Sequence, residues 1–385
     1  MLASQRADFD IPREVAYFNA AGWSPIPNAV VEAGVRGARR KAQPWTLASD
    51  FADALHERTR AAAAGLIHAD PSDVALIPSV GYGVAAAAKG FPVPRGSRVL
   101  VIEDDHSAPV LEWLGRADAQ GFVVETVARP ADGDWTSAVV AAIQRPGAAP
   151  LAIASISSVH WSDGGAIDLD QVSKAVKAAG AALLVDATHA AGVMDLDVRR
   201  IDPDFLIFPT YKWLLGPYGR AFLYVAKRRQ EAVPLEQPSY ARRGVKAEQA
   251  VYLEDTRYLP DARRFDMGER DHFVSMEMAA VGIETIAGYG QAAICERLSM
   301  LTGLMARRIA EIGNRVSLPD ARFRAPHILS VGFPEGMPKG LVASLAAANV
   351  HAAPRIGRLR LSPHVYNDEE DIERLVSALQ SAVRA

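Results

Sequence analysis

The sequence predicts an α/β fold: a large domain with a mostly parallel sheet flanked by helices, plus a smaller α+β C-terminal domain. Between residues 74 and 225, apolar runs of strand length alternate with stretches of helical periodicity. That alternation is typical of a parallel sheet whose crossover helices cover both faces. After residue 325, two further apolar runs alternate with two amphipathic stretches, which indicates a second, smaller unit.

The chain begins with a short expected strand around VAYF, a turn rich in Gly and Pro, and two helices before Pro71. Asn19 and Ala21 lie in that turn, where they either contact a ligand or serve only the turn itself. The expected strands of the sheet then follow, separated mostly by helical patterns. They are VALIPS (74–79), SRVLVIED (97–104), GFVVETVA (121–128), LAIASISSV (151–159), AALLVD (181–186), DFLIF (204–208) and AFLYV (221–225).

Beyond Lys227 the alternation weakens. Residues 234–273 are polar and are expected to form an extended excursion over the surface or toward a partner subunit. A helix from about 284 to 312 leads to the small domain, which contains the strands 327–334 and 358–363 and the helices 339–350 and 368–383. We expect a large domain at 20–285 and a small domain that combines 1–19 with 286–385.

The composition is that of an ordinary globular protein. The 385 residues are 49% hydrophobic and 23% charged, with a formal net charge of -3. This balance favours neither nucleic acid nor a membrane as a partner. The first residues lack an apolar run of signal-peptide length, so a cytoplasmic location is expected. The single cysteine, Cys295, excludes an internal disulfide and a cysteine-built metal site, and no metal is expected.

Lys212 stands out because it lies in a turn-rich segment between two apolar runs, among aromatic, Leu, Gly and Pro residues. A lysine shielded from water loses part of its preference for the charged form, which is what a Schiff-base amine needs. The structural alternative is a lysine that extends its amine to the surface. The residues that surround it in the fold decide between the two.

Ligands of an open parallel sheet bind outside the carboxyl ends of its strands. The polar residues found there match the needs of pyridoxal phosphate. Backbone N–H groups of Ser79, Val80, Gly81 and Tyr82 open a helix and suit a phosphate, without forming the GxGxxG of a dinucleotide site. Asp186 suits the ring nitrogen, His106 the ring face, His189 and Ser158 the phenolic oxygen, and Lys212 the aldehyde. Singly, each also has a structural explanation as a turn, a helix cap or a buried histidine.

With these residues, the sequence resembles the class V aminotransferase family of fold type I, which includes cysteine desulfurases and isopenicillin N epimerase. DATHAAG, TYKWLLGPYGRAFLYV and GRLRLSPHVYNDEEDIERLV carry the resemblance, which extends over nearly the whole chain. It implies that Lys212 forms the internal aldimine, that Thr210 and the Ser79 turn hold the phosphate, and that Arg360 pairs with a substrate carboxylate. Arg355 is a further substrate candidate, with a solvated position as its alternative.

Several positions depart from the family pattern. Tyr211 precedes the lysine where a histidine is usual, and we expect its phenol to bind the cofactor phosphate without adding a positive charge. His189 replaces a glutamine, and Ser158 stands where asparagine is frequent. Glu269 occupies the place of a threonine that reaches the neighbouring subunit's phosphate, and Arg270 beside it offers a replacement. The stretch NVHAAPRIGRLRLS lacks the nucleophilic cysteine of the desulfurases, which argues against persulfide chemistry.

The expected function is that of an enzyme in which Lys212 takes the α-proton of a small amino acid or amine. We expect an aminotransferase, with a β-lyase or an epimerase as the alternative, and a non-catalytic binding protein as a weaker one. The resemblance also implies a homodimer.

Overall fold

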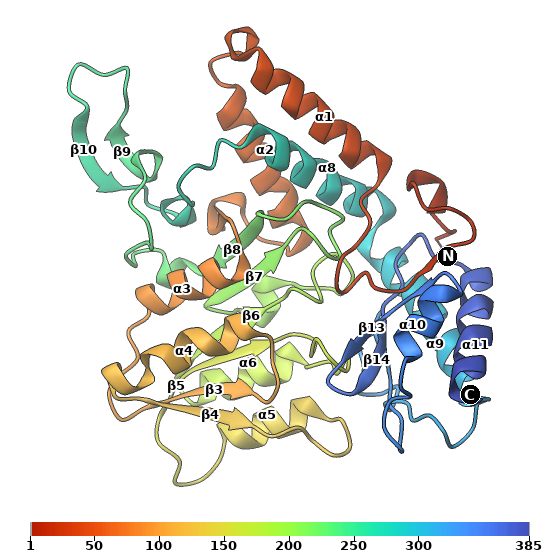
Figure 1. Ribbon diagram of the computed structural model, residues 1–385. Coiled ribbons are helices and arrows are strands. Elements are labelled where there is room, and N and C mark those ends of the chain that lie inside the picture. Colours follow the sequence, from red (N-terminus) through yellow and green to blue (C-terminus); the bar gives the residue numbers. More distant parts are fainter. Residues whose placement is uncertain (1, 385) are drawn as a thin grey trace.

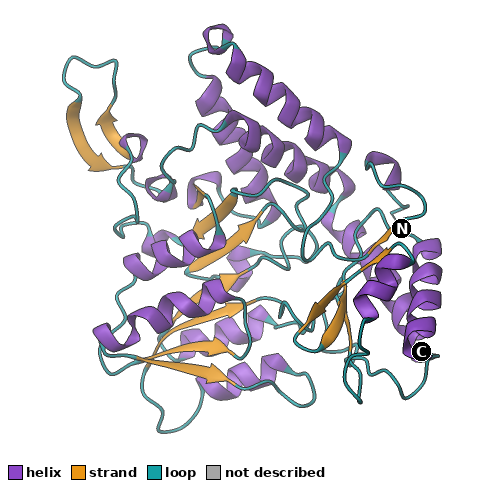
Figure 2. Ribbon diagram, viewed as in Figure 1, coloured by secondary structure: helices purple, strands orange, loops and turns teal. Residues whose placement is uncertain are grey.

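In the computed structural model, which describes residues 2–384, seven strands form the central sheet (Figures 1 and 2). β8 is antiparallel to both of its neighbours, and every other pairing is parallel. The strands in spatial order are β2 (Val74–Ile77), β8 (Ala221–Val225), β7 (Phe205–Pro209), β6 (Ala182–Asp186), β5 (Leu151–Ser157), β3 (Arg98–Ile102) and β4 (Val123–Val127). The prediction of a mostly parallel sheet is confirmed.

Helices cover both faces of the sheet because most of its strands are apolar on both sides. α3 (Val80–Gly90) and α4 (Ser107–Gln120) pack on the face that includes Val101 and Ile207, and α4 contributes the buried Trp113. α5 (Trp135–Ile143), α6 (Leu169–Ala178) and the short α7 (Val198–Ile201) lie on the opposite side, with Leu100 and Leu206. Asp134 and Asp168 cap α5 and α6 by accepting backbone N–H groups.

Three long helices form a separate layer at one end of the sheet (Figure 1): α1 (Asn28–Ala42), α2 (Phe51–Leu66) and α8 (Phe273–Tyr289). α1 approaches α8 closely at Gly37, where a Cβ would lie 2.8 Å from the Val274 backbone. α9 (Gln291–Ala310) follows α8 after a break. The prediction of a single helix from about 284 to 312 is therefore wrong at its N-terminal end, where residues 284–289 belong to α8. Gly290 sits at the break with φ +83°, a conformation that favours glycine and ends the first helix.

The polar excursion contains an antiparallel hairpin of β9 (Arg242–Val245) and β10 (Leu253–Tyr258). Figure 1 shows this hairpin projecting from the body of the molecule. Its tip carries Val251, Tyr252 and Leu253, all of them exposed.

The C-terminal region forms a smaller layer of strands and helices beside the sheet (Figures 1 and 2). β14 (Arg358–Leu361) lies between β11 (Leu329–Val331) and β13 (Ala353–Arg355), and α10 (Leu341–Ala347) and α11 (Glu369–Arg384) pack nearby. The N-terminal β1 (Ala16–Tyr17) pairs in parallel with β12 (Val350–His351). This pairing agrees with grouping 1–19 with the small domain, although the domain boundaries themselves stay a prediction.

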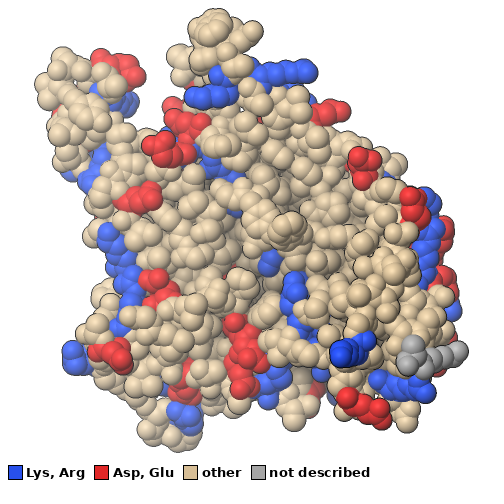
Figure 3. Space-filling view, in the orientation of Figure 1, with Lys and Arg blue, Asp and Glu red and all other residues tan. Residues whose placement is uncertain are grey.

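Charged side chains of both signs are scattered over the face shown in Figure 3, without a broad field of one sign. Within residues 2–384, none of the helices combines the length and the apolar character that crossing a membrane requires.

Candidate active site

Lys212 lies in the connection between β7 and β8, at the sheet edge where the parallel strands end. Residues that end or follow five of the strands surround it in one cavity: Val80, His106, Ser157, Asp186, Thr188, His189 and Tyr211. The cavity opens into a cleft of about 410 Å³ whose outer wall includes Trp23, Trp161, Tyr218, Arg355 and Arg360. The structure therefore brings Lys212, Asp186, His106 and His189 together, as the carboxyl-end rule predicts.

His189 joins Lys212 to Trp213 and has a defined tautomer. Trp213 Nε1 lies 3.2 Å from His189 Nδ1, and His189 Nε2 lies 3.1 Å from Lys212 Nζ. Because an indole N–H only donates, Nδ1 is the acceptor, and the neutral imidazole carries its proton on Nε2. That N–H donates to Lys212 Nζ, which accepts a hydrogen bond only as a neutral amine.

The electrostatics of the cavity favour the same protonation states. Burial first, and then the positive charge of Arg360, lower the pKa of Lys212 from 10.5 to about 7, against an opposing effect of Asp186. Burial and the charge of Lys212 also hold the pKa of His189 well below its usual value. The site therefore presents an amine that is available as a base or nucleophile near neutral pH.

Two carboxyl groups lie at the inner end of the cleft. Asp186, which ends β6, is buried, and its Oδ1 accepts the N–H of Thr188 at 2.9 Å. Asp105 accepts from Ser157 Oγ at 2.6 Å and from the His106 N–H at 2.7 Å. Burial raises the pKa of Asp105 to about 6, with a smaller contribution from the charge of Asp186. Asp186 thus faces the cavity as a positioned carboxylate, while Asp105 organises the segment that carries His106.

The turn after β2 presents backbone donors to the cavity. Ser79 Oγ accepts the N–H of Tyr82 at 3.1 Å and caps α3. The N–H groups of Val80 and Gly81 open the helix and so have no intrahelical acceptor. A Cβ added at Gly81 would meet only Ser79 Oγ, at 4.0 Å, so the space above the turn is open. This is the geometry of an anion site at a helix N-terminus.

Aromatic rings line the remainder of the cleft. His106 is exposed, and its ring meets Trp161 edge-on with centroids 6.1 Å apart. Trp161 Nε1 donates to the Asp104 carbonyl at 2.6 Å, which holds the indole in place. Tyr211 stacks on Tyr218 at 3.9 Å, and burial raises the pKa of Tyr211 to about 12.

Arg360 on β14 is buried and reaches the cleft from the small domain. Its Nη1 donates to the Trp161 carbonyl at 2.7 Å and its Nη2 to Asn19 Oδ1 at 3.5 Å, whereas its Nε has no partner within residues 2–384. Burial, and next the charge of Arg355, lower its pKa to about 9. Ala21 also lines the cleft, and its N–H donates to Ser362 Oγ at 3.0 Å.

Two other predicted cofactor residues, Thr210 and Ser158, do not line the cavity of Lys212. Thr210 Oγ1 is buried and donates to the carbonyls of Pro217 and Arg220, so its hydroxyl is already engaged. Ser158 Oγ donates to the Asp186 carbonyl at 3.2 Å, and it is the neighbouring Ser157 that lines the cavity. The ligand roles assigned to Thr210 and Ser158 stay predictions.

Glu269 and Arg270, the candidates for contact with a neighbouring subunit's phosphate, do not line the cavity or the cleft of Lys212. Glu269 is exposed, with φ +54°, and Arg270 Nη1 donates to Asp266 Oδ2 at 2.8 Å. Arg270 is thus already paired within this chain, and its role toward a neighbouring subunit stays a prediction.

Sequence reasoning missed three residues of the cavity or its support: Asp105, Thr188 and the Trp213 indole. Asp105 and Thr188 do follow expected strands, so the rule that selected Asp186 offered a signal for both. Nothing in the sequence pattern indicated that Trp213 would donate to His189.

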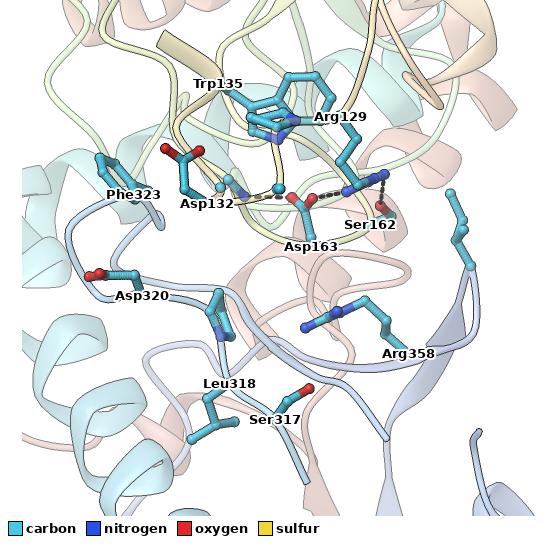
Figure 4. A pocket seen from close by; sticks show the side chains of 16 residues that line it. Arg129, Asp132, Trp135, Ser162, Asp163, Ser317, Leu318, Asp320, Phe323 and Arg358 are labelled. Atoms are coloured by element: carbon cyan, nitrogen blue, oxygen red, sulfur yellow. Dashed lines mark hydrogen bonds and ion pairs between the residues drawn. The ribbon is translucent and has the colours of Figure 1, made fainter. Parts of the chain in front are cut away.

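A second hollow of about 520 Å³ is lined in part by Ser162 and Ile356, the residues that directly follow Trp161 and Arg355. Figure 4 shows Arg129, Trp135, Asp163, Phe323 and Arg358 around it, with Arg129 bonded to Asp163. Arg358 Nε donates to Ser330 Oγ at 2.7 Å. Arg358 therefore belongs to this hollow, whereas Arg355 and Arg360 belong to the cleft of Lys212.

Comparisons with known proteins agree with this architecture. A model of the aminotransferase class-V family matches residues 16–375. Isopenicillin N epimerase of Streptomyces clavuligerus is 28% identical over 383 residues, covering 95% of this chain and 94% of the epimerase. YcbU of Bacillus subtilis (strain 168), described as an uncharacterized aminotransferase, is 25% identical over 327 residues, covering 82% of this chain and 80% of YcbU.

A solved cysteine desulfurase of Thermococcus onnurineus NA1 has a similar fold. It superposes with a TM-score of 0.83 at 22% sequence identity, and the match covers 98% of this chain and 97% of the desulfurase. At this level of identity, the likeness establishes the fold.

Proposed function

The chain belongs to the aminotransferase class-V family. We propose that it is an aminotransferase in which Lys212 moves the α-proton of an amino acid or amine. The observation that carries this proposal is the hydrogen bond from His189 Nε2 to Lys212 Nζ, which requires a neutral amine. A buried lysine with a pKa near 7 suits a base at the reacting carbon.

When bound, pyridoxal phosphate, the cofactor of this family, supplies an aldehyde and a ring that accepts electrons from a carbanion.

The residues of the cleft fit that cofactor. Thr188 Oγ1 and Arg360 Nε are buried polar atoms without a partner within residues 2–384, as expected of groups that face an absent ligand. The open N–H groups of Val80 and Gly81 would hold the phosphate, and Asp186 would hold a proton on the ring nitrogen. His189 Nε2–H would donate to the phenolic oxygen, and the exposed His106 would cover the ring.

The chain's own residues then divide the work. Arg360 binds and orients the substrate carboxylate through its free Nε, because a guanidinium pairs with a carboxylate in a defined plane. Lys212 Nζ, about half of which is neutral at pH 7, accepts the proton from the substrate's α-carbon and returns it. Return of the proton at a different carbon corresponds to transamination, and return to the opposite face of the α-carbon to epimerisation.

Absorption spectroscopy of the purified protein tests the proposal. We expect a visible cofactor band in the wild type that is lost in Lys212→Ala and kept in the control Lys339→Ala, since Lys339 is exposed and lines neither the cavity nor the cleft. Mass spectrometry and chiral analysis of the products from a panel of amino donors then separate transamination from β-elimination and epimerisation. A colourless protein that takes up no added cofactor contradicts the proposal.

The proposal includes a homodimer. The projecting β9–β10 hairpin carries Val251, Tyr252 and Leu253 at its tip, with exposed fractions of 61%, 55% and 60%, and a second copy would cover them. Sedimentation equilibrium should give twice the monomer mass for the wild type and weaker association for Tyr252→Ser. A monomer at all concentrations contradicts this part.

A further inference from the structure

Two guanidinium groups face the same cleft as Lys212. Arg355 ends β13 and Arg360 lies on the adjacent β14, where Ala353 is the residue that pairs with Arg360. Both line the cleft beside Trp161 and Lys212. The cleft therefore has one more cation at its outer wall than a single substrate carboxylate would occupy.

Neither guanidinium is neutralised by the protein. Within residues 2–384, no carboxylate oxygen lies within 4.0 Å of a side-chain nitrogen of Arg355 or Arg360, whereas most arginines of this chain have such a partner. Arg355 Nη1 donates only to the carbonyl of its neighbour Pro354, at 2.7 Å, and its guanidinium lies 5.9 Å from the centroid of the Trp161 ring.

The carboxyl groups of the cleft are committed elsewhere. Asp105 accepts from Ser157 and His106, and Asp186 lies in the inner cavity with Lys212 and His189. Burial lowers the pKa of Arg355, and the charge of Arg355 lowers the pKa of both Arg360 and Lys212. A buried Arg360 and a half-buried Arg355 that repel each other indicate that the ligand brings more than one negative charge.

We propose that Arg355 forms a second anion subsite, so that the substrate is an amino acid whose side chain carries a carboxylate. This inference rests on the proposed function, in which Arg360 binds the α-carboxylate. Trp161, Trp23 and Tyr218 would contact the methylene groups between the two charges. Arg355 is thus a specificity-determining residue of this chain.

Isothermal titration calorimetry of the cofactor-loaded protein tests the subsite with unreactive ligands. Succinate and glutarate carry two carboxylates, and butyrate and valerate are the matched monocarboxylates. We expect the dicarboxylates to bind about 10- to 100-fold more tightly, the range of one charge-assisted hydrogen-bonded pair. Arg355→Gln should abolish this difference without weakening butyrate, and Arg355→Lys should keep part of it.

Arg358→Gln is the control, because it removes the same charge three residues away, from a side chain that lines the other hollow (Figure 4). Its preference for dicarboxylates should equal that of the wild type. Equal affinity for both ligand classes in the wild type, or an unchanged preference in a folded Arg355→Gln protein, overturns the inference. Calorimetry does not depend on the visible band, so the two proposals can fail separately. A coloured protein without a preference for dicarboxylates refutes this subsite alone. A colourless protein that takes up no added cofactor refutes the proposed function.

Discussion

The low pKa of Lys212 can be measured directly in protein freed of cofactor. At pH 7 an amine with a pKa of about 7 is about half neutral, whereas one at 10.5 is only about 0.03% neutral. The shift corresponds to about 5 kcal/mol at 1.36 kcal/mol per pKa unit. Because the folded pKa lies below the unfolded one, this difference lowers the stability of the cofactor-free protein as the pH falls from 10.5 toward 7.

Competitive acetylation with acetic anhydride reads this pKa residue by residue. Mass spectrometry of the Lys212 peptide across pH 5 to 11 should give a labelling midpoint near pH 7, with the exposed Lys339 as the reference for reagent. Arg360→Gln should raise the midpoint because it removes the largest unfavourable charge, and Asp186→Asn should lower it because it removes the opposing one. A wild-type midpoint near 10, or a midpoint that falls in Arg360→Gln, refutes the reasoning.

Three further predictions concern stability. Asp266 is fully buried and pairs with Arg60 at 2.8 Å and 3.0 Å, so Asp266→Ala should cost about 3–5 kcal/mol in urea unfolding, because the buried Arg60 then keeps only Glu57 as a carboxylate partner. Arg60 and its neighbours hold the pKa of Asp266 below the usual value, so the stability that this carboxylate contributes is present at neutral pH and lost as the pH falls below about 4. Acid titration of the wild type should show this loss of stability, and Asp266→Ala should lack it. A Cβ at Gly282 would lie 2.7 Å from the Leu214 carbonyl, so Gly282→Ala should lower the free energy of unfolding by about 1–3 kcal/mol. Gly288→Ala on the same helix is the control, because a Cβ there would have no atom within 4 Å. Equal melting temperatures for the two variants contradict this account.

Much of the site could be predicted from the sequence because a parallel sheet brings the carboxyl ends of its strands to one edge. Asp186, His106, His189 and Lys212 each follow an apolar run that forms a strand, and they line one cavity. The same rule could not predict which of two neighbouring residues at the end of a strand faces the cavity. Asp104, with φ +55°, turns the chain so that Asp105 accepts from Ser157. Likewise Ser157 lines the cavity and Ser158 does not.

The sequence by itself determined the alternation of strands and helices in the central sheet and the family, because these depend on local periodicity and short motifs. Only the tertiary structure decided the protonation of Lys212, because that state depends on burial and on Trp213 holding the tautomer of His189. It also separated Arg355 from Arg358, which pair with each other across one hairpin turn but line different hollows. Side-chain direction in a loop follows from backbone angles and packing, and neither can be predicted from the order of residue types.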